Sequence, residues 1–282
     1  MRKTTPTTRV TRTTPTAKAL ALVMLAFAAG CGSQSPESVT FPQGTIVDLS
    51  HSYGADTVFW PTAEPFKLTV VNDGVTPAGF YYAANNFSMA EHGGTHIDAP
   101  VHFARGRNAV DQIPLEHLIG PAFVVDVTKQ AAANPDYLVT PEDIENAEEA
   151  VDRKIPEGAI LLIRTGFSSR WPDAAKYLGT AERGEAAVAN LHFPGVHPQA
   201  ARFLLNSRKI NALGIDTASI DFGQSKTYET HQILYDANIP GLENLTGLDN
   251  LPVIGATVVA LPMKIKGGSG APLRAIAILP KR

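Results

Sequence analysis

The chain has 282 residues, of which 24 are basic and 27 acidic, and its formal net charge is −3 at pH 7. Five of the basic residues fall in the first 18 positions; without them, 19 basic and 27 acidic residues leave a net charge of −8. That charge does not favour nucleic acid or an anionic lipid surface as a partner. A single cysteine excludes an intrachain disulfide.

The first 30 residues have the layout of a signal peptide. Positions 1–18 are basic and free of acids, and an apolar run over 19–29 is too short for a stable membrane-spanning helix. Small residues directly before Cys31 resemble the lipobox of bacterial lipoproteins. We therefore expect lipidation of Cys31, a polar tether over 31–43 and an extracytoplasmic, membrane-anchored location, periplasmic or at the cell surface. A plain secretory signal with a stray cysteine is the alternative.

Residues 44–282 read as one α/β domain with a mixed sheet. Two apolar runs, 159–164 and 212–217, are typical of strands buried on both faces. Thr140 and Asp143 have the spacing of a capping box, which predicts a helix from there to about Val151. The other expected strands cover 45–50, 66–71, 79–88, 122–127, 257–265 and 272–279. The other expected helices cover 114–119 and 198–206, and 168–193 reads as an inserted lid or interface loop.

One stretch concentrates the chemistry, because it holds His92, His96, Asp98 and His102. Counted from His92, the offsets are four, six and ten, and even offsets share one face of an extended segment. Two glycines and a proline inside the stretch argue against a helix. Imidazole and carboxylate donors suit zinc, manganese or iron. Ordinary surface or core histidines are the alternative, but a buried cluster of such charges is costly without a metal to pair them.

A second group follows later in the chain. Asp221 precedes His231, which begins a helical pattern, and Glu243 comes twelve residues after His231. Taken one at a time, these residues are unremarkable. Trp60, a large aromatic residue in a proline-bounded loop, is either a substrate-stacking wall or a loop anchor. A glycine-rich turn over 266–270 is weak evidence for phosphate binding, and we predict no phosphate site there.

The run His-Gly-Gly-Thr-His-Ile-Asp-Ala-Pro-Val-His over 92–102 resembles the signature of the cyclase family of metal-dependent hydrolases. Bacterial kynurenine formamidase and isatin hydrolase belong to that family. The stretch 214–221 and the pair His231 and Glu243 are similar to it as well, so the resemblance extends from about residue 45 to the end. The inserted region around 170–194 is closer to the longer isatin-hydrolase-like members.

The resemblance implies roles for individual residues. His102 matches the catalytic histidine of the family, and Asp98 matches a ligand able to bridge two ions. It also implies a swivelling β/β/α fold, a dimer or tetramer, and one or two divalent ions, Zn²⁺ or Mn²⁺. The implied metal ligands are His92, His96 and Asp98 for a first ion, and His231 and Glu243 for a second.

The implied activity is hydrolysis of a small, aromatic amide, formamide or cyclic amide by metal-activated water. His102, with a pKa near neutrality, would carry the proton from water to the leaving nitrogen. Hydrolysis of a lactone or cyclic imide on the same site stays open, and so does a binding lipoprotein without turnover. Kynurenine formamidase serves tryptophan catabolism, whereas an extracytoplasmic address favours scavenging or detoxification of an external cyclic amide.

Overall fold

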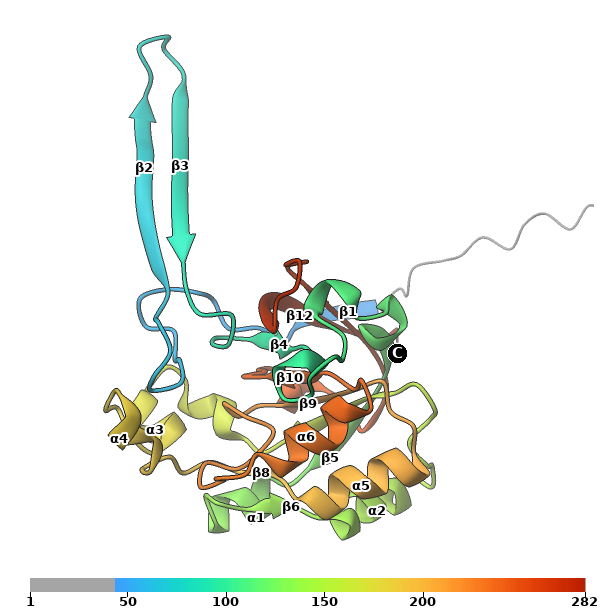
Figure 1. The fold of residues 1–282 in the computed structure, drawn as a ribbon. Helices are drawn as coiled ribbons and strands as arrows, with labels where there is room; N and C mark the ends of the chain where they lie inside the picture. Colours follow the sequence, from blue (N-terminus) through green and yellow to red (C-terminus); the bar gives the residue numbers. More distant parts are fainter. Residues whose placement is uncertain (1–43, 282) are drawn as a thin grey trace, which may run out of the picture. The chain divides into compact units, whose positions relative to one another are not determined.

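A ring of seven strands forms the centre of the domain (Figure 1). The computed structural model describes residues 44–281, and its main sheet runs in the order β1-β12-β11-β5-β7-β9-β10-β4, with β4 pairing back onto β12. The predicted mixed α/β domain is confirmed, and the ring makes the sheet barrel-like. The strands of the main sheet are β1 (Gly44–Asp48), β4 (His96–Asp98), β5 (Ile119–Asp126), β7 (Ile160–Arg164), β9 (Ala212–Ile215), β10 (Gly241–Glu243), β11 (Ile254–Pro262) and β12 (Gly270–Pro280).

Strand β12 closes the ring because it is long enough to serve three neighbours. Its first residues, 270–272, pair with β4; residues 273–278 pair with β11; and 276–280 pair with β1. Each pairing is antiparallel, whereas β5, β7 and β9 run parallel to one another. The sheet is therefore mixed, as the sequence predicts.

The parallel strands are buried on both faces, which explains their unbroken apolar sequences. In β7, Ile160 and Leu162 join the core inside the ring, while Leu161 and Ile163 face the second core, beneath the helices. All four side chains are fully buried. This alternation follows from the two-residue period of a strand, and it lets one strand hold two cores together.

Three helices cover the outer face of these strands, as Figure 1 shows. Helix α2 (Pro141–Ala150) begins where the capping box predicts: the Thr140 hydroxyl accepts from the Asp143 amide, and the Asp143 carboxylate accepts from the Thr140 amide. Ile144, Leu204 and Leu234 anchor the three helices in the core. The other two covering helices are α5 (Pro198–Ser207) and α6 (Glu229–Asp236). A short helix, α1 (Thr128–Ala133), and two short paired strands, β6 (Leu138–Val139) and β8 (Gly195–Val196), lie outside the main sheet.

Two expectations need correction. The helix predicted over 114–119 is a single 3₁₀ turn, Leu115–His117, because β5 already begins at Ile119. The segment 168–193 is not an irregular loop: it folds into two short helices around a buried aromatic cluster that includes Tyr177 and Phe193. Its helices are α3 (Ala174–Leu178) and α4 (Glu185–Val188), and the other 3₁₀ turns are Pro100–His102, Val110–Gln112, Phe167–Arg170 and Leu248–Asn250.

A hairpin of two predicted strands, β2 (Lys67–Val75) and β3 (Tyr81–Ser88), extends away from the ring (Figure 1). Within the part of the chain that the structure describes, these strands pair only with each other, and nearly all their residues are exposed.

The predicted signal peptide, the predicted tether and Cys31 lie outside the described residues. Over residues 44–281, no helix has the length and apolar character needed to cross a bilayer.

Candidate metal centre and active site

The side chains of the histidine-rich stretch meet at one place, but not because the whole stretch is extended. Only His96–Asp98 form a strand, β4. His92 precedes it in a bend that passes through Gly94 at φ +60°, and His102 ends a 3₁₀ turn. The predicted convergence is confirmed, whereas the predicted geometry is wrong: bends on either side of a short strand bring the four groups together.

Strand pairing brings the second group to the first. In the antiparallel register of β4 and β10, Glu243 lies opposite His96 and Gly241 lies opposite Asp98. Opposed residues project to the same face of a sheet, so the Glu243 carboxylate and the His96 imidazole share one face. The Glu243 Oε2 atom lies 3.5 Å from His96 Nε2.

Helix α6 supplies His231 and Tyr235, which are four residues apart and therefore on one side of the helix. The His231 Nε2 atom lies 3.2 Å from Glu243 Oε1 and 3.4 Å from Asp98 Oδ2. The Tyr235 hydroxyl donates to Asp98 Oδ2 at 2.9 Å. Asp98, on β4, therefore contacts two side chains of helix α6.

Two of the imidazoles have their tautomers set by acceptors outside the cluster. His96 Nδ1–H donates to the Gly94 carbonyl at 2.9 Å, and His231 Nδ1–H donates to Asp221 Oδ2 at 2.6 Å. Because a carbonyl or carboxylate only accepts, each ring keeps a proton on Nδ1, and its Nε2 atom, which faces Asp98 and Glu243, is the nitrogen that can bind a cation. His96 Nε2 is buried and makes no hydrogen bond with any described residue.

The donor set fits one or two divalent cations. Two groups of ligand atoms, each within 4.8 Å, share Asp98: one with His92 and His96, the other with His231 and Glu243. The Asp98 and Glu243 carboxylates are buried, and the lone pair of His96 Nε2 is unsatisfied. Imidazole and carboxylate are the donors that Zn²⁺ and Mn²⁺ accept. A shared carboxylate between two positions is the arrangement expected of a bridging ligand.

The electrostatics of the cluster favour positive charge. Burial opposes ionisation of Asp98, but the imidazoles of His92, His231 and His96 outweigh it and hold the pKa of that carboxyl well below its usual range. Burial alone would lower the pKa of His231, yet the surrounding carboxylates, Asp221 first among them, raise it well above the ordinary value. A divalent cation would supply the same compensation for these carboxylates.

His102 stands beside the cluster rather than in it. Its ring stacks on the His92 ring at 3.9 Å between centroids, and its Nε2 lies 4.0 Å from Asp98 Oδ2. Burial lowers the pKa of His102 to about 4, although Asp98 acts in the opposite direction. The expected near-neutral pKa is therefore not found, because desolvation and the neighbouring imidazoles disfavour the charged ring.

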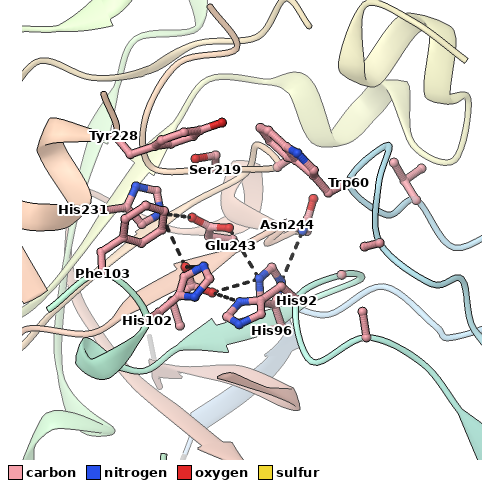
Figure 2. A pocket seen from close by; sticks show the side chains of 16 residues that line it. Trp60, His92, His96, His102, Phe103, Ser219, Tyr228, His231, Glu243 and Asn244 are labelled. Carbon is pink, nitrogen blue, oxygen red and sulfur yellow. Dashed lines mark hydrogen bonds and ion pairs between the residues drawn. The ribbon is translucent and has the colours of Figure 1, made fainter. Parts of the chain in front are cut away.

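A cavity of about 350 Å³ opens onto the cluster, and Trp60 forms part of its wall (Figure 2). The Trp60 ring meets Phe193 and Tyr228 edge-on, at 6.3 and 6.4 Å between centroids. Trp60 lines the cavity and packs on the inserted segment, so it anchors its loop, and contact with a substrate stays a prediction. The lining residues are Val58, Trp60, Ala63, Ala90, His92, Gly93, His96, Asp98, His102, Phe103, Ala218, Ser219, Tyr228, His231, Glu243 and Asn244.

Three further residues of the site were not predicted. Tyr235 could have been found, because it lies one helical turn after His231. Asn244 donates to the Gly94 carbonyl at 2.8 Å and so ties β10 to the bend before β4, a contact between distant segments without a sequence signal. Tyr228 holds a left-handed backbone conformation at φ +48°, which is unusual for an aromatic residue.

Known proteins share this architecture. The family model named Cyclase matches residues 47–222. An isatin hydrolase of Roseibium aggregatum is 35% identical over 248 residues, which is 85% of this chain and 89% of that protein. The chain belongs to the Cyclase family. It is a metal-dependent hydrolase, and the fold and family predicted from the sequence are confirmed.

Two further relatives extend the comparison for this Cyclase-family member. A kynurenine formamidase of Salinibacter ruber is 29% identical over 236 residues, covering 82% of this chain and 96% of that one. The solved structure of isatin hydrolase A from Labrenzia aggregata, bound to benzyl benzoate, superimposes with a TM-score of 0.75 at 37% identity. It covers 84% of this chain and 94% of the other.

We expect Asp98→Asn to lower the affinity for Zn²⁺ or Mn²⁺ more than about 100-fold, because it removes the charge shared by both cation positions. His102→Ala should retain the ion, since the His102 ring belongs to neither ligand group. Equilibrium dialysis followed by metal analysis measures both. Asp236→Asn, a change to an exposed carboxylate paired with Arg107, is the control; near-normal binding by Asp98→Asn would contradict the assignment.

Proposed function

We propose that this hydrolase cleaves a small aromatic amide, either an N-formyl amide or a cyclic amide, at a C–N bond other than a peptide bond. The observation that carries the proposal is one cavity that joins a cluster of imidazoles and carboxylates to aromatic rings: Trp60 and Tyr228 lie across from the cluster, and Phe103 packs against its imidazoles (Figure 2). The relatives named isatin hydrolase and kynurenine formamidase support the same reaction class.

In this proposal Asp98 is the ligand shared by two cation positions. When bound, a Zn²⁺ or Mn²⁺ ion lowers the pKa of water and polarises a carbonyl. The chain's own residues hold the position: a backbone carbonyl keeps His96 turned toward the cluster, and a carboxylate does the same for His231. His92 and His96 complete the first position, and His231 and Glu243 complete the second.

His102 is the proposed proton carrier. Its side chain is partly open to the cavity, and the stacking contact with His92 holds the ring beside Asp98. An imidazole in this place accepts a proton as water attacks the carbonyl carbon. It then gives the proton to the nitrogen as the C–N bond breaks, so that one residue serves as base and then as acid.

The aromatic wall defines the expected substrate. Trp60, Phe103 and Tyr228 all line the cavity, and the Phe103 and Tyr228 rings lie 5.4 Å apart. Flat faces of this kind stack on an aromatic ring, and a solved relative holds a ligand with benzene rings. We therefore propose that Trp60 contacts the substrate ring while its amide carbonyl points to the cluster.

The decisive measurement is hydrolysis by the chain from Gly32 onward, loaded with Zn²⁺ or Mn²⁺ and offered isatin and N-formylkynurenine side by side. We expect turnover of at least one. His102→Ala should lower kcat by about 10²- to 10⁴-fold without loss of the ion.

His192→Ala is the matched control, because His192 is an exposed histidine paired with Asp136 outside the cavity. No turnover of either amide with the ion bound would favour a lactone or cyclic imide as substrate, or a binding role. Full activity of His102→Ala would remove its assigned role.

The location is a further proposal. We propose that Cys31 carries a lipid and anchors the domain outside the cytoplasm through the tether over 31–43, which suits scavenging of an external amide. The support is the sequence pattern alone. Membrane fractionation of the full chain and of Cys31→Ser tests it: the variant should leave the membrane fraction, and identical fractionation would contradict the anchor.

We also propose a homo-oligomer, built through the exposed hairpin. A one-residue bulge between Val70 and Asn72 shifts the register of β2 against β3. Without the bulge, Val75 would lie on the opposite face from Leu68. With it, five large apolar side chains that are 53–74% exposed share one face of the hairpin with Asp73, Ala83 and Asn85: Leu68, Val70, Val75, Tyr81 and Phe87.

The opposite face is mostly polar, with Lys67, Thr69 and Asn86 among its residues. A two-stranded ribbon is at best marginally stable alone, so its apolar face calls for a partner. The same chain offers one, an apolar groove of about 340 Å³ at the base of the hairpin. The groove includes Phe66 and Met263. A second copy can exchange hairpin for groove around a two-fold axis.

We expect the chain from Gly32 to be a dimer or tetramer by light scattering at micromolar concentration. Val70→Asp should shift it to monomer, because it places a charge in the buried contact. Asn86→Asp puts the same charge on the polar face and should leave the oligomer intact. A monomeric wild-type chain, or equal behaviour of the two variants, would contradict the hairpin interface.

A further inference from the structure

The glycine-rich turn over 266–270 lies against the candidate metal centre, although no function was predicted for it. We infer that this turn, through Ser269 and Glu91, is a positioning device that fixes the tautomer of His92, so that Nδ1 rather than Nε2 is its ligand atom. The inference rests on the proposed metal centre. It assigns a function to two residues outside the predicted ligand set.

One carboxylate oxygen ties the turn to the stretch that contains the ligands. Glu91 Oε2 accepts from the Ser269 hydroxyl at 2.7 Å, from the Ser269 amide at 2.9 Å and from the Gly270 amide at 3.3 Å. All three donors belong to the turn, and Glu91 directly precedes His92. The turn and the His92 backbone are therefore held as one unit.

The direction of the hydrogen bonds follows from donor chemistry. A serine hydroxyl has one proton, and a carboxylate only accepts. Since Ser269 donates to Glu91, its oxygen must accept from His92 Nε2, which lies 2.9 Å away. The proton of a neutral His92 ring is thereby fixed on Nε2. The Nδ1 atom lies 2.6 Å from Asp98 Oδ1, so it donates to that carboxylate when no cation is bound and is the free ligand atom when a cation takes the proton's place.

His92 thus has the opposite tautomer to His96 and His231. His96 and His231 hold their protons on Nδ1 and turn Nε2 to the cluster, whereas His92 holds its proton on Nε2 and turns Nδ1 inward. The three acceptors that set these states come from a backbone carbonyl, a carboxylate and a serine hydroxyl backed by a carboxylate. In each ring one nitrogen is held outward and the other faces Asp98.

The turn can approach this closely only because it lacks side chains at two positions. A Cβ atom on Gly270 would lie 2.6 Å from His92 Cε1, and one on Gly268 would lie 2.8 Å from Glu91 Oε1. Both distances are shorter than van der Waals contact. On its other side the turn is fixed by the Ala99 amide, which donates to the Ser269 carbonyl at 2.8 Å.

The consequence reaches His102 as well. An outer hydrogen bond to a carboxylate orients a ligating imidazole and raises its basicity, and loss of such a partner typically costs 10- to 100-fold in metal affinity. The His102 ring stacks on the His92 ring that the turn holds in place. The turn therefore positions His92, a ligand of the first cation position, and through the stacking contact it also positions His102, the proposed proton carrier.

The test measures Zn²⁺ affinity and imidazole tautomers in the full chain. Ser269→Ala removes the hydroxyl, and Glu91→Gln removes the charge behind it. Ser169→Ala removes an exposed serine hydroxyl that donates to the Gly166 carbonyl and is the control. Proton–nitrogen correlation spectra of the Zn²⁺-loaded chain, assigned with His92→Ala, show which ring nitrogen carries the proton.

In the wild type we expect the His92 proton on Nε2, with the other two ligands protonated on Nδ1. Ser269→Ala should weaken Zn²⁺ binding by about 10- to 100-fold and let both His92 tautomers appear, with Glu91→Gln intermediate and Ser169→Ala unchanged. Glu91→Gln carries the test alone if Ser269→Ala fails to fold.

Unchanged affinity and an unchanged tautomer pattern in both variants would overturn the inference, as would a wild-type chain that binds no Zn²⁺. A chain that binds Zn²⁺ as expected but hydrolyses neither amide would leave the inference standing and remove only the proposed reaction.

Discussion

The structure depends on one buried carboxylate, that of Asp98. It lies on β4, the strand that closes the ring, and its backbone pairs with both β10 and β12. Burying a carboxylate costs several kcal/mol unless charge and hydrogen bonds compensate. Here His92, from the bend before β4, and His231 and Tyr235, both from helix α6, provide that compensation. The strand pairings that close the ring therefore also place the residues of the site together.

This dependence explains why the site lies where the strands of the main sheet are shortest. The long parallel strands of the centre are apolar on both faces and leave no room for a polar cluster. Strands β4 and β10 have three residues each, and each sends alternate side chains into the ring core and into the site. Ile97 and Leu242 enter the core, while His96 and Glu243 enter the site. On each of these strands, adjacent residues therefore serve the hydrophobic core and the metal centre.

Local signals predicted much of this arrangement. The capping box at Thr140 and the apolar run of β7 are patterns that a few neighbouring residues determine, and both are confirmed. The bends around β4 could not be read from the even spacing, because tertiary packing sets the space around Gly94, where a Cβ atom would lie 2.4 Å from the Tyr53 ring. The pairing of β10 with β4 is equally hidden, since it joins segments about 145 residues apart and three residues carry no periodicity.

The pairing of Gly44 with Pro280 sets the two ends of the described domain side by side, where β1 lies along the end of β12. Because the ends are adjacent, a short peptide could join them while new ends are opened in a surface turn elsewhere, which is the condition for circular permutation. Such a permutation would keep every strand pairing and both ligand groups while changing their order along the chain. The ring requires its strand pairings, but the order in which the chain supplies the strands can differ.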